Sequence, residues 1–190
     1  MILHRFTRPS LRPLLPALLL GLSLSLTSPV MASAPDGEQP AQAASTGATP
    51  LDQLAQKKFP APDGTALDVA TLKGKPVVIN FWATWCPPCI REMPDLAALA
   101  REMGDQAAFL GIAADTDGNV KKFTAKNPDI DFPLVLAGYN ALNLSRQWGN
   151  ERGGLPFTVV LDAKGQIQWR HSGTVDVEAL RSMLKSGELR

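Results

Sequence analysis

Two cysteines, Cys86 and Cys89, are the residues whose type and spacing say most about the chemistry of this chain. They enclose Pro87 and Pro88 in a Cys-Pro-Pro-Cys segment, and the chain has no other cysteine. Two thiols with this spacing lie one helical turn apart, so their sulfur atoms are within reach of each other. Such a pair can form and release a disulfide, which makes thiol–disulfide exchange the first chemistry to consider.

Other Cys-x-x-Cys chemistries fit the residues less well. A haem attachment site requires His directly after the second cysteine, where this chain has Ile90. A tetrahedral zinc site needs about four ligands, and beyond the N-terminus only His171 could join the cysteines unless carboxylates completed the site. A structural disulfide closing so small a ring would contribute only about 2 kcal/mol. Redox chemistry is favoured, with no metal and no cofactor besides the Cys86–Cys89 disulfide.

A strand followed by a helix must position the two thiols. Residues 77–82 form a β-branched and aromatic run without alternation, which is typical of a central strand covered on both faces. The prolines fit the first turn of a helix. Apolar residues at three- and four-residue spacing continue that helix to near Gly104, and Pro94 should bend it. Cys86 then lies at or next to the N-cap, where unpaired N–H groups and the helix dipole favour a thiolate.

The two thiols are expected to have different roles. Cys86 is the nucleophile that attacks a partner disulfide, and Cys89, one turn deeper, resolves the mixed disulfide. Pro87 and Pro88 lack the backbone N–H groups that could stabilise a Cys86 thiolate, so the Cys89 N–H is the main donor left. A less stabilised thiolate disfavours the reduced form, which predicts a pair more reducing than that of a strong oxidant.

Four further residues are candidates for the same site. Trp85 flanks the nucleophile and can shield it or contact substrates. Glu92 follows Cys89 by three residues on the same helix, and is either a surface carboxylate or the proton acceptor for Cys89. Pro156 opens a predicted strand, and a cis Leu155–Pro156 bond facing the cysteines would present the Leu155 backbone to a docking substrate strand.

The remaining pattern predicts an α/β domain. Further strands are expected at residues 108–113, 134–136, 157–162 and 166–171. Further helices are expected from residue 116 or 117 to 126, from 141 to 148, and over the last apolar face from 177 to 184. A tight turn makes the last two strands antiparallel, so the order gives a three-layer α/β/α domain with a mixed sheet. The sequence also allows an additional N-terminal β-hairpin, with residues 58–60 beside 66–68.

The N-terminal residues are typical of an export signal. Three arginines precede a short apolar run at residues 14–26, and small residues with an Ala-x-Ala end follow at 30–34. The run is shorter than the ~20 residues that span a membrane, so we expect residues 1–34 to be a cleaved signal peptide, with an uncleaved tether as the alternative. Residues 35–50 lack large apolar side chains and predict a flexible linker, which leaves 51–190 as the folded domain.

The charge balance does not favour a nucleic acid as partner. The chain has 19 basic and 18 acidic residues, and three basic but no acidic residues lie in the predicted signal peptide. The remainder therefore has 16 basic and 18 acidic residues, a net charge of −2. An even balance without a basic stretch predicts neither nucleic acid nor an anionic membrane surface as a partner.

Several motifs together resemble the thioredoxin-like TlpA/ResA/DsbE family. They are residues 80–89, Glu92-Met93-Pro94, Gly154-Leu155-Pro156 and residues 159–165. The resemblance implies a thioredoxin fold, a cis-proline at Pro156 and reduction of protein disulfides in the periplasm. It also implies protein disulfide or dithiol substrates, including apocytochrome c during cytochrome c maturation, and a membrane thiol transporter as electron donor. A glutamate after the Cys-x-x-Cys of some members matches Glu92 and supports its acid–base role.

Two positions depart from the relatives. Asn80 stands where thioredoxin has a buried aspartate. Phe157 follows the proline where the cytochrome-dedicated DsbE branch usually has Glu, so a general TlpA-like reductase is favoured over an apocytochrome-specific one. Two alternatives stay open: a disulfide oxidase or isomerase with the opposite electron flow, and a Cu(I)-binding module that uses Cys86 and Cys89 as soft ligands.

Overall fold

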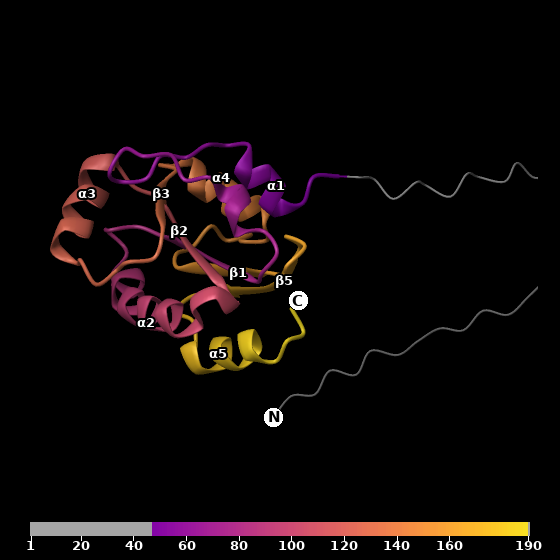
Figure 1. The fold of residues 1–190 in the computed structure, drawn as a ribbon. Helices are drawn as coiled ribbons and strands as arrows, with labels where there is room; N and C mark the ends of the chain where they lie inside the picture. Colours follow the sequence, from indigo (N-terminus) through magenta and orange to yellow (C-terminus); the bar gives the residue numbers. More distant parts are fainter. Residues whose placement is uncertain (1–46, 190) are drawn as a thin grey trace, which may run out of the picture. The chain divides into compact units, whose positions relative to one another are not determined.

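A computed structural model describes residues 47–189 (Figure 1). The predicted signal peptide and all but the last four residues of the predicted linker lie outside the described residues. Between residues 47 and 189, no helix is both long enough and apolar enough to cross a membrane.

The first helix, α1 (Pro50–Ala55), begins at the last residue of the predicted linker. The Thr49 hydroxyl accepts a hydrogen bond from the Asp52 N–H (3.1 Å), and the Asp52 carboxylate accepts one from the Thr49 N–H (3.0 Å). This reciprocal pair is a capping box, which satisfies two donors that a helix start leaves unpaired. The sequence prediction missed this helix because six residues are too few to show a clear period.

Five strands form one mixed sheet in the order β3-β2-β1-β4-β5. Strands β1 (Val77–Trp82), β2 (Ala108–Ala113) and β3 (Leu134–Leu136) run parallel to one another. Strand β4 (Phe157–Leu161) pairs antiparallel with β1, and β5 (Ile167–Ser172) pairs antiparallel with β4. Every residue of β1, β2 and β4 is buried, whereas β5 at the sheet edge alternates between half-buried and exposed. The continuous apolar runs therefore mark the central strands, as predicted.

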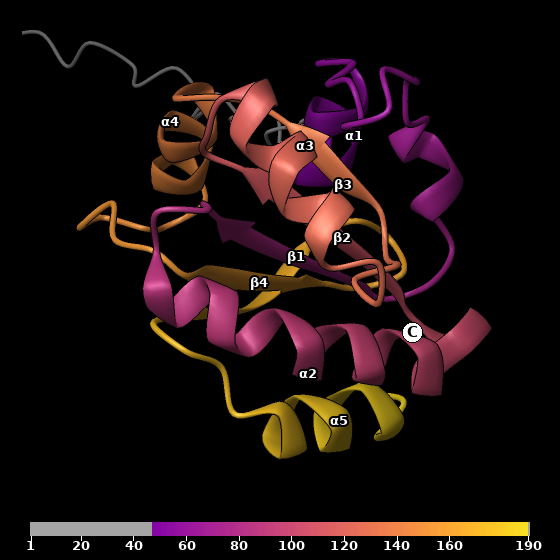
Figure 2. The same ribbon diagram turned by 90° about the vertical axis from the view of Figure 1, so that its left-hand side faces the viewer.

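Helices cover both faces of this sheet. They are α2 (Pro87–Met103), α3 (Asp117–Lys126), α4 (Asn140–Gln147) and α5 (Val177–Lys185), with short 3₁₀ turns η1 (Val69–Leu72) and η2 (Gly104–Gln106). Figure 2 shows α2 and α5 side by side on one face. Neighbouring β1 residues point to opposite faces: Trp82 contacts Phe123 of α3 (centroids 4.9 Å apart), and Phe81 contacts Trp148 at the end of α4 (5.7 Å). The predicted three-layer α/β/α architecture is confirmed.

The predicted N-terminal hairpin is present only as a single antiparallel bridge between Pro60 and Ala66. Pro60 and Pro62 have no N–H group to extend a ladder on this strand. The Pro60 carbonyl instead accepts a hydrogen bond from the Leu136 N–H of β3 (2.8 Å). Two full strands therefore do not form, and the segment lies along the outer edge of the sheet.

Candidate active site

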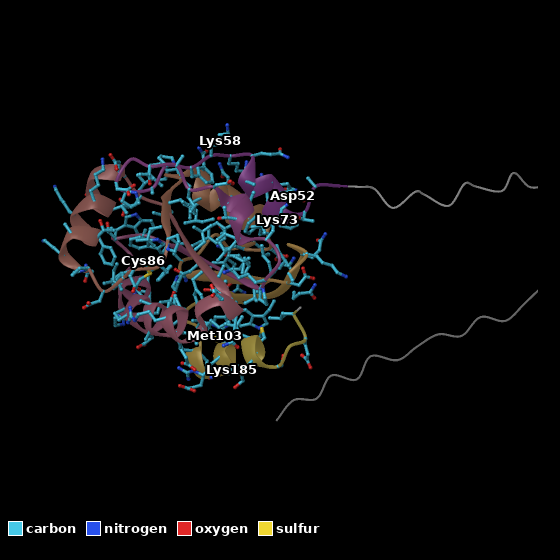
Figure 3. All side chains as sticks on the ribbon, in the orientation of Figure 1. Asp52, Lys58, Lys73, Cys86, Met103 and Lys185 are labelled. Atoms are coloured by element: carbon cyan, nitrogen blue, oxygen red, sulfur yellow. A yellow bond between two sulfur atoms is a disulfide. The ribbon has the colours of Figure 1, made fainter. Side chains whose placement is uncertain are left out.

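Cys86 and Cys89 form a disulfide with an S–S distance of 2.02 Å (Figure 3). Cys86 is the N-cap of α2, as predicted, and Pro87 and Pro88 fill the first two helical positions. The Cys86 sulfur accepts a hydrogen bond from the Cys89 N–H (3.3 Å). Pro87 and Pro88 have no N–H group, so the Cys89 N–H is the first backbone donor of the helix, and it contacts this sulfur.

The two sulfur-bearing residues differ slightly in access to solvent. Cys86 is 4% exposed and Cys89 is fully buried. A partner disulfide can reach only a sulfur that has some access to the surface, so the geometry favours attack at Cys86. Trp85, directly before it, is 57% exposed. Its position fits the predicted contact with substrates.

The Leu155–Pro156 peptide bond is cis, as predicted. Phe157 at the start of β4 pairs with Phe81 of β1, one residue before the end of that strand. Pro156 therefore lies beside the end of β1 from which the chain continues to Cys86. Pro156 is buried and Leu155 is half-buried, so part of the Leu155 residue stays accessible at this edge.

Glu92 is buried inside the domain, with an exposed fraction of 2%. Its Oε1 accepts a hydrogen bond from Asn80 Nδ2 (2.8 Å), and its Oε2 accepts one from the Val175 N–H (3.0 Å). Burial raises the pKa of Glu92, although both hydrogen bonds and the nearby His171 favour the charged form. The alternative of an ordinary surface carboxylate is wrong.

Asn80 and Thr158 complete this buried network, which the sequence analysis did not predict. Asn80 Nδ2 also donates to Thr158 Oγ1 (3.0 Å), and the two residues are paired across β1 and β4. A polar residue within each of two otherwise apolar buried strands was the available signal, because buried polar groups normally bond to one another. Glu92 is therefore held in place by the sheet as well as by its own helix.

Asp115 also supports the site and was missed from sequence. Its Oδ2 accepts hydrogen bonds from the Thr84 N–H (2.8 Å) and the Thr84 hydroxyl, and its Oδ1 from the Thr116 N–H (2.7 Å) and Asn119 Nδ2 (2.9 Å). Burial opposes ionisation, but these hydrogen bonds outweigh it and lower the pKa of Asp115. The carboxylate ties the loop before Cys86 to the start of α3. The signal available in the sequence was an acidic residue just after β2, the strand that pairs with β1.

Replacing Asp115 with Ala should lower the free energy of unfolding by about 2 kcal/mol, because the Thr84 N–H and its neighbours lose their acceptor. The pKa of Asp115 in the folded state lies below the ordinary 3.8. The stabilisation by its carboxylate is therefore fully present above pH 3.8 and is lost as the pH falls through the folded pKa. Urea denaturation at neutral and acidic pH measures both effects. Asp117→Ala, on an exposed carboxylate, is the matched control; an equal loss there would contradict the assignment.

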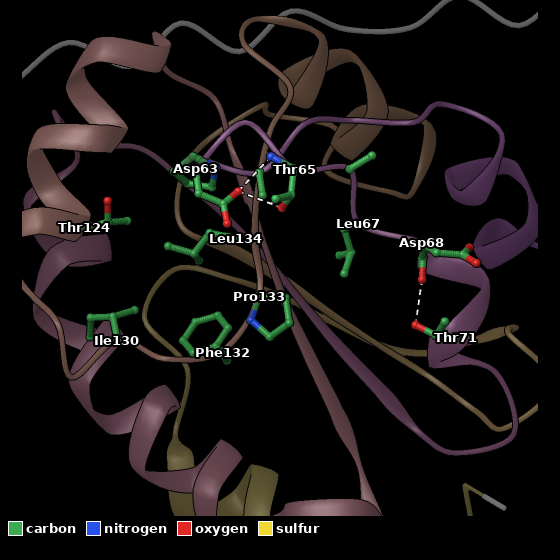
Figure 4. Close-up of a pocket in the computed structure, with 13 residues that line it drawn as sticks. Asp63, Thr65, Leu67, Asp68, Thr71, Thr124, Ile130, Phe132, Pro133 and Leu134 are labelled. Atoms are coloured by element: carbon green, nitrogen blue, oxygen red, sulfur yellow. Dashed lines mark hydrogen bonds between the residues drawn. The ribbon is translucent and has the colours of Figure 1, made fainter.

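A cavity of about 660 Å³ lies between residues 61–71, α3 and β3 (Figure 4). Leu67, Ile130, Phe132 and Leu134 form much of its apolar wall. None of the predicted site residues lines it, so it is separate from the redox site. In the described part of the chain, no group of three or more His, Cys, Asp or Glu residues is placed to hold a metal ion.

Known proteins share part of this sequence. The thioredoxin-like protein YneN of Bacillus subtilis is 34% identical over an alignment of 122 residues, and the match covers 59% of this chain and 65% of YneN, just under two thirds of its length. The thiol-disulfide oxidoreductase ResA of Bacillus cereus is 32% identical over an alignment of 127 residues, and the match covers 65% of this chain and 69% of ResA.

A solved structure and a family match agree with these relatives. The crystal structure of a thioredoxin-related protein from Neisseria meningitidis serogroup B gives a TM-score of 0.58 at 32% identity, over 67% of this chain and 96% of that one. The thioredoxin-like fold is therefore confirmed. The Redoxin family matches residues 32–185. The chain belongs to the Redoxin family, among its thioredoxin-like members such as ResA and YneN.

Proposed function

We propose that this protein is a thiol–disulfide oxidoreductase that acts on protein disulfides outside the cytoplasm. The observation that carries the proposal is the Cys86–Cys89 disulfide at the N-cap of α2, next to the end of β1 that faces cis Pro156. A helix N-terminus stabilises a thiolate, and an accessible backbone beside it can bind an extended substrate. The matched relative ResA carries the name thiol-disulfide oxidoreductase.

The proposed reaction moves two electrons to the substrate. The Cys86 thiolate attacks one sulfur of the substrate disulfide; that S–S bond breaks, and the other substrate sulfur leaves and takes up a proton. Cys89 then loses its proton to the Glu92 carboxylate and attacks the Cys86 sulfur. The Cys86–Cys89 disulfide forms as the bond between Cys86 and the substrate breaks, and the second substrate sulfur leaves as a thiolate and takes up a proton. The protein ends oxidised and the substrate reduced.

We propose that the protein works as a reductant rather than an oxidant. Its Cys86 sulfur has one backbone donor, the Cys89 N–H, because Pro87 and Pro88 supply none. A membrane thiol transporter would then return electrons to the cysteines, and apocytochrome c would be one of the candidate substrates. The redox state of the pair in growing cells tests the direction: a reductant is mostly dithiol, whereas an oxidase is mostly disulfide.

Replacing Pro88 with Ala should make the pair more oxidising. The second helical residue then has an N–H that can bond to the N-cap sulfur of Cys86. One hydrogen bond to a charged group is worth about 1.5–3 kcal/mol, so the reduction potential should rise by about 30–60 mV and the pKa of Cys86 should fall. Equilibration with glutathione and alkylation against pH measure the two quantities. Pro87→Ala is the control, because the first helical N–H does not reach the N-cap side chain; equal shifts would contradict the argument.

A further inference from the structure

We propose that arginines around residues 149–154 form a docking surface for substrate segments with acidic side chains close to the target disulfide. Arg146, Arg152 and Arg170 make up this surface and are called the arginine cluster. The inference rests on the proposed function, since it concerns which disulfides reach Cys86.

Two members of the arginine cluster pack against glycines of the loop. A Cβ atom on Gly153 would lie 2.6 Å from Arg146 Nη2, and one on Gly149 would lie 2.9 Å from Arg170 Nε. The φ angles of Gly153 and Gly149 are 64° and 100°, a backbone conformation that residues with a side chain rarely adopt. Arg170 Nε also donates to the Trp148 carbonyl (2.7 Å). The glycines thus leave room for both guanidinium groups to lie against the loop backbone.

The charges of the arginine cluster are not neutralised by carboxylates of residues 47–189 within 4.0 Å. By contrast, Arg101 pairs with Asp131 (2.9 Å) and Arg181 pairs with Glu102 (2.8 Å). Glu151 brings one carboxylate to the loop itself but forms no described ion pair with the cluster. All three cluster side chains are exposed. Three guanidinium groups against one carboxylate leave a surface that attracts acidic groups.

Asn150 holds the loop in a fixed relation to the redox site. It is 1% exposed, and its Nδ2 donates to the Gly154 carbonyl (2.8 Å) and to Ser145 Oγ (3.1 Å). Its own N–H donates to the Ser145 carbonyl (2.9 Å). Gly154 directly precedes Leu155 and cis Pro156. Arg152 is therefore part of the segment that offers its backbone beside the disulfide, and Arg146 and Arg170 lie against glycines of that segment.

This placement selects a class of substrate. An extended polypeptide that pairs with the Leu155 backbone while its cysteine faces Cys86 advances about 3.3 Å per residue. Its side chains about two to four residues from that cysteine would then lie over the loop. Asp or Glu at these positions would meet a guanidinium, whereas Lys or Arg would be repelled. The preferred substrates are extended disulfide-bonded segments with acidic residues next to the cysteine.

The test compares two peptides, each with a single cysteine that is held in a disulfide bond. The two peptides differ only in having Glu or Lys near that cysteine. The full chain is reduced, mixed with each peptide, and the second-order rate constant of exchange is followed by acid quenching and mass spectrometry. We expect the Glu peptide to react about tenfold faster than the Lys peptide at about 0.02 M salt, and nearly equally at about 0.5 M salt.

Two variants and a control assign the preference to the arginine cluster. The double variant Arg152→Gln/Arg170→Gln should reduce the ratio of the Glu-peptide rate to the Lys-peptide rate at low salt to about twofold. Arg152→Gln alone, which breaks no described hydrogen bond, should give a ratio between those of the wild type and the double variant. Lys122→Gln, on an exposed lysine of α3 without a described ion pair, should keep the full preference. Equal rates for the two peptides, or an unchanged preference in the double variant, overturn the docking surface alone. Absence of exchange with both peptides overturns the proposed function instead.

Discussion

Replacing Cys86 with Ser should reduce the rate of disulfide exchange by at least about 10³-fold, whereas replacing Cys89 with Ser should preserve the first attack and stop the reaction after it. The difference follows from position. Cys86 is the N-cap residue with some solvent access, and Cys89 is fully buried behind it. Without the second thiol, the covalent link between Cys86 and its substrate cannot be resolved from within the protein.

The measurement is the capture of mixed disulfides in cells that express Cys89→Ser, followed by identification of the linked proteins by mass spectrometry. The double variant that lacks both thiols is the control and should capture nothing. Capture through Cys89 in the Cys86→Ser variant at the same level would reverse the two roles. Recovery of apocytochromes alone would narrow the substrates to cytochrome c maturation, and recovery of several unrelated proteins would favour a general reductase.

Replacing Glu92 with Gln should slow the resolving step by about 10²-fold, the usual contribution of a positioned proton acceptor. Because burial raises the pKa of Glu92, the wild-type rate should increase with pH until this carboxyl is ionised and then level off. The variant should lose this inflection and keep only the rise due to the Cys89 thiol itself. Stopped-flow kinetics of mixed-disulfide decay between about pH 5 and 9 separate the two profiles.

The substitution is a fair test because the buried network can accept an amide. If the Asn80 side chain turns over, its Oδ1, which has no partner now, can accept from the new amide group and from the Thr158 hydroxyl. The Val175 N–H keeps an oxygen acceptor. Loss of activity would then not reflect a broken core, and Asp95→Asn, on an exposed acid of the same helix, should leave both rate and profile unchanged.

The stability of the Glu92 variant gives an independent check with a defined sign. The pKa of Glu92 in the folded state lies above the ordinary 4.5, so the folded state holds the proton of this carboxyl more tightly than the unfolded state does. The contribution of Glu92 to the free energy of unfolding is therefore fully present below pH 4.5 and is lost as the pH rises through the folded pKa. The Gln variant has no such titration and should show no such fall. At neutral pH it should therefore be no less stable than the wild type by urea denaturation. A wild type whose stability rises with pH over this interval would show that Glu92 is not destabilised by burial.

The sequence alone determined the features that depend on a few adjacent residues. The run at residues 77–82, the two cysteines and the prolines between them predicted the buried strand, the helix start and the Cys86 N-cap, and all are present. The cis Leu155–Pro156 bond was predicted from its local context together with the cysteines. The strand, the helix start and the N-cap follow from backbone preferences and hydrophobic pattern, which act within about one element.

Only the tertiary structure decided the surroundings of the thiols. The buried Glu92 carboxylate accepts a hydrogen bond from the Val175 N–H, 83 residues away, and Asp115 accepts one from the Thr84 N–H, 31 residues away. Such contacts depend on which strands are neighbours and in what register, and no local pattern encodes that. The same holds for Arg146 and Arg170, which come from α4 and β5 to one loop. Cys86 and Cys89 could be recognised from sequence because they are close neighbours, whereas only the fold places Glu92 against Asn80 and the two arginines against one loop.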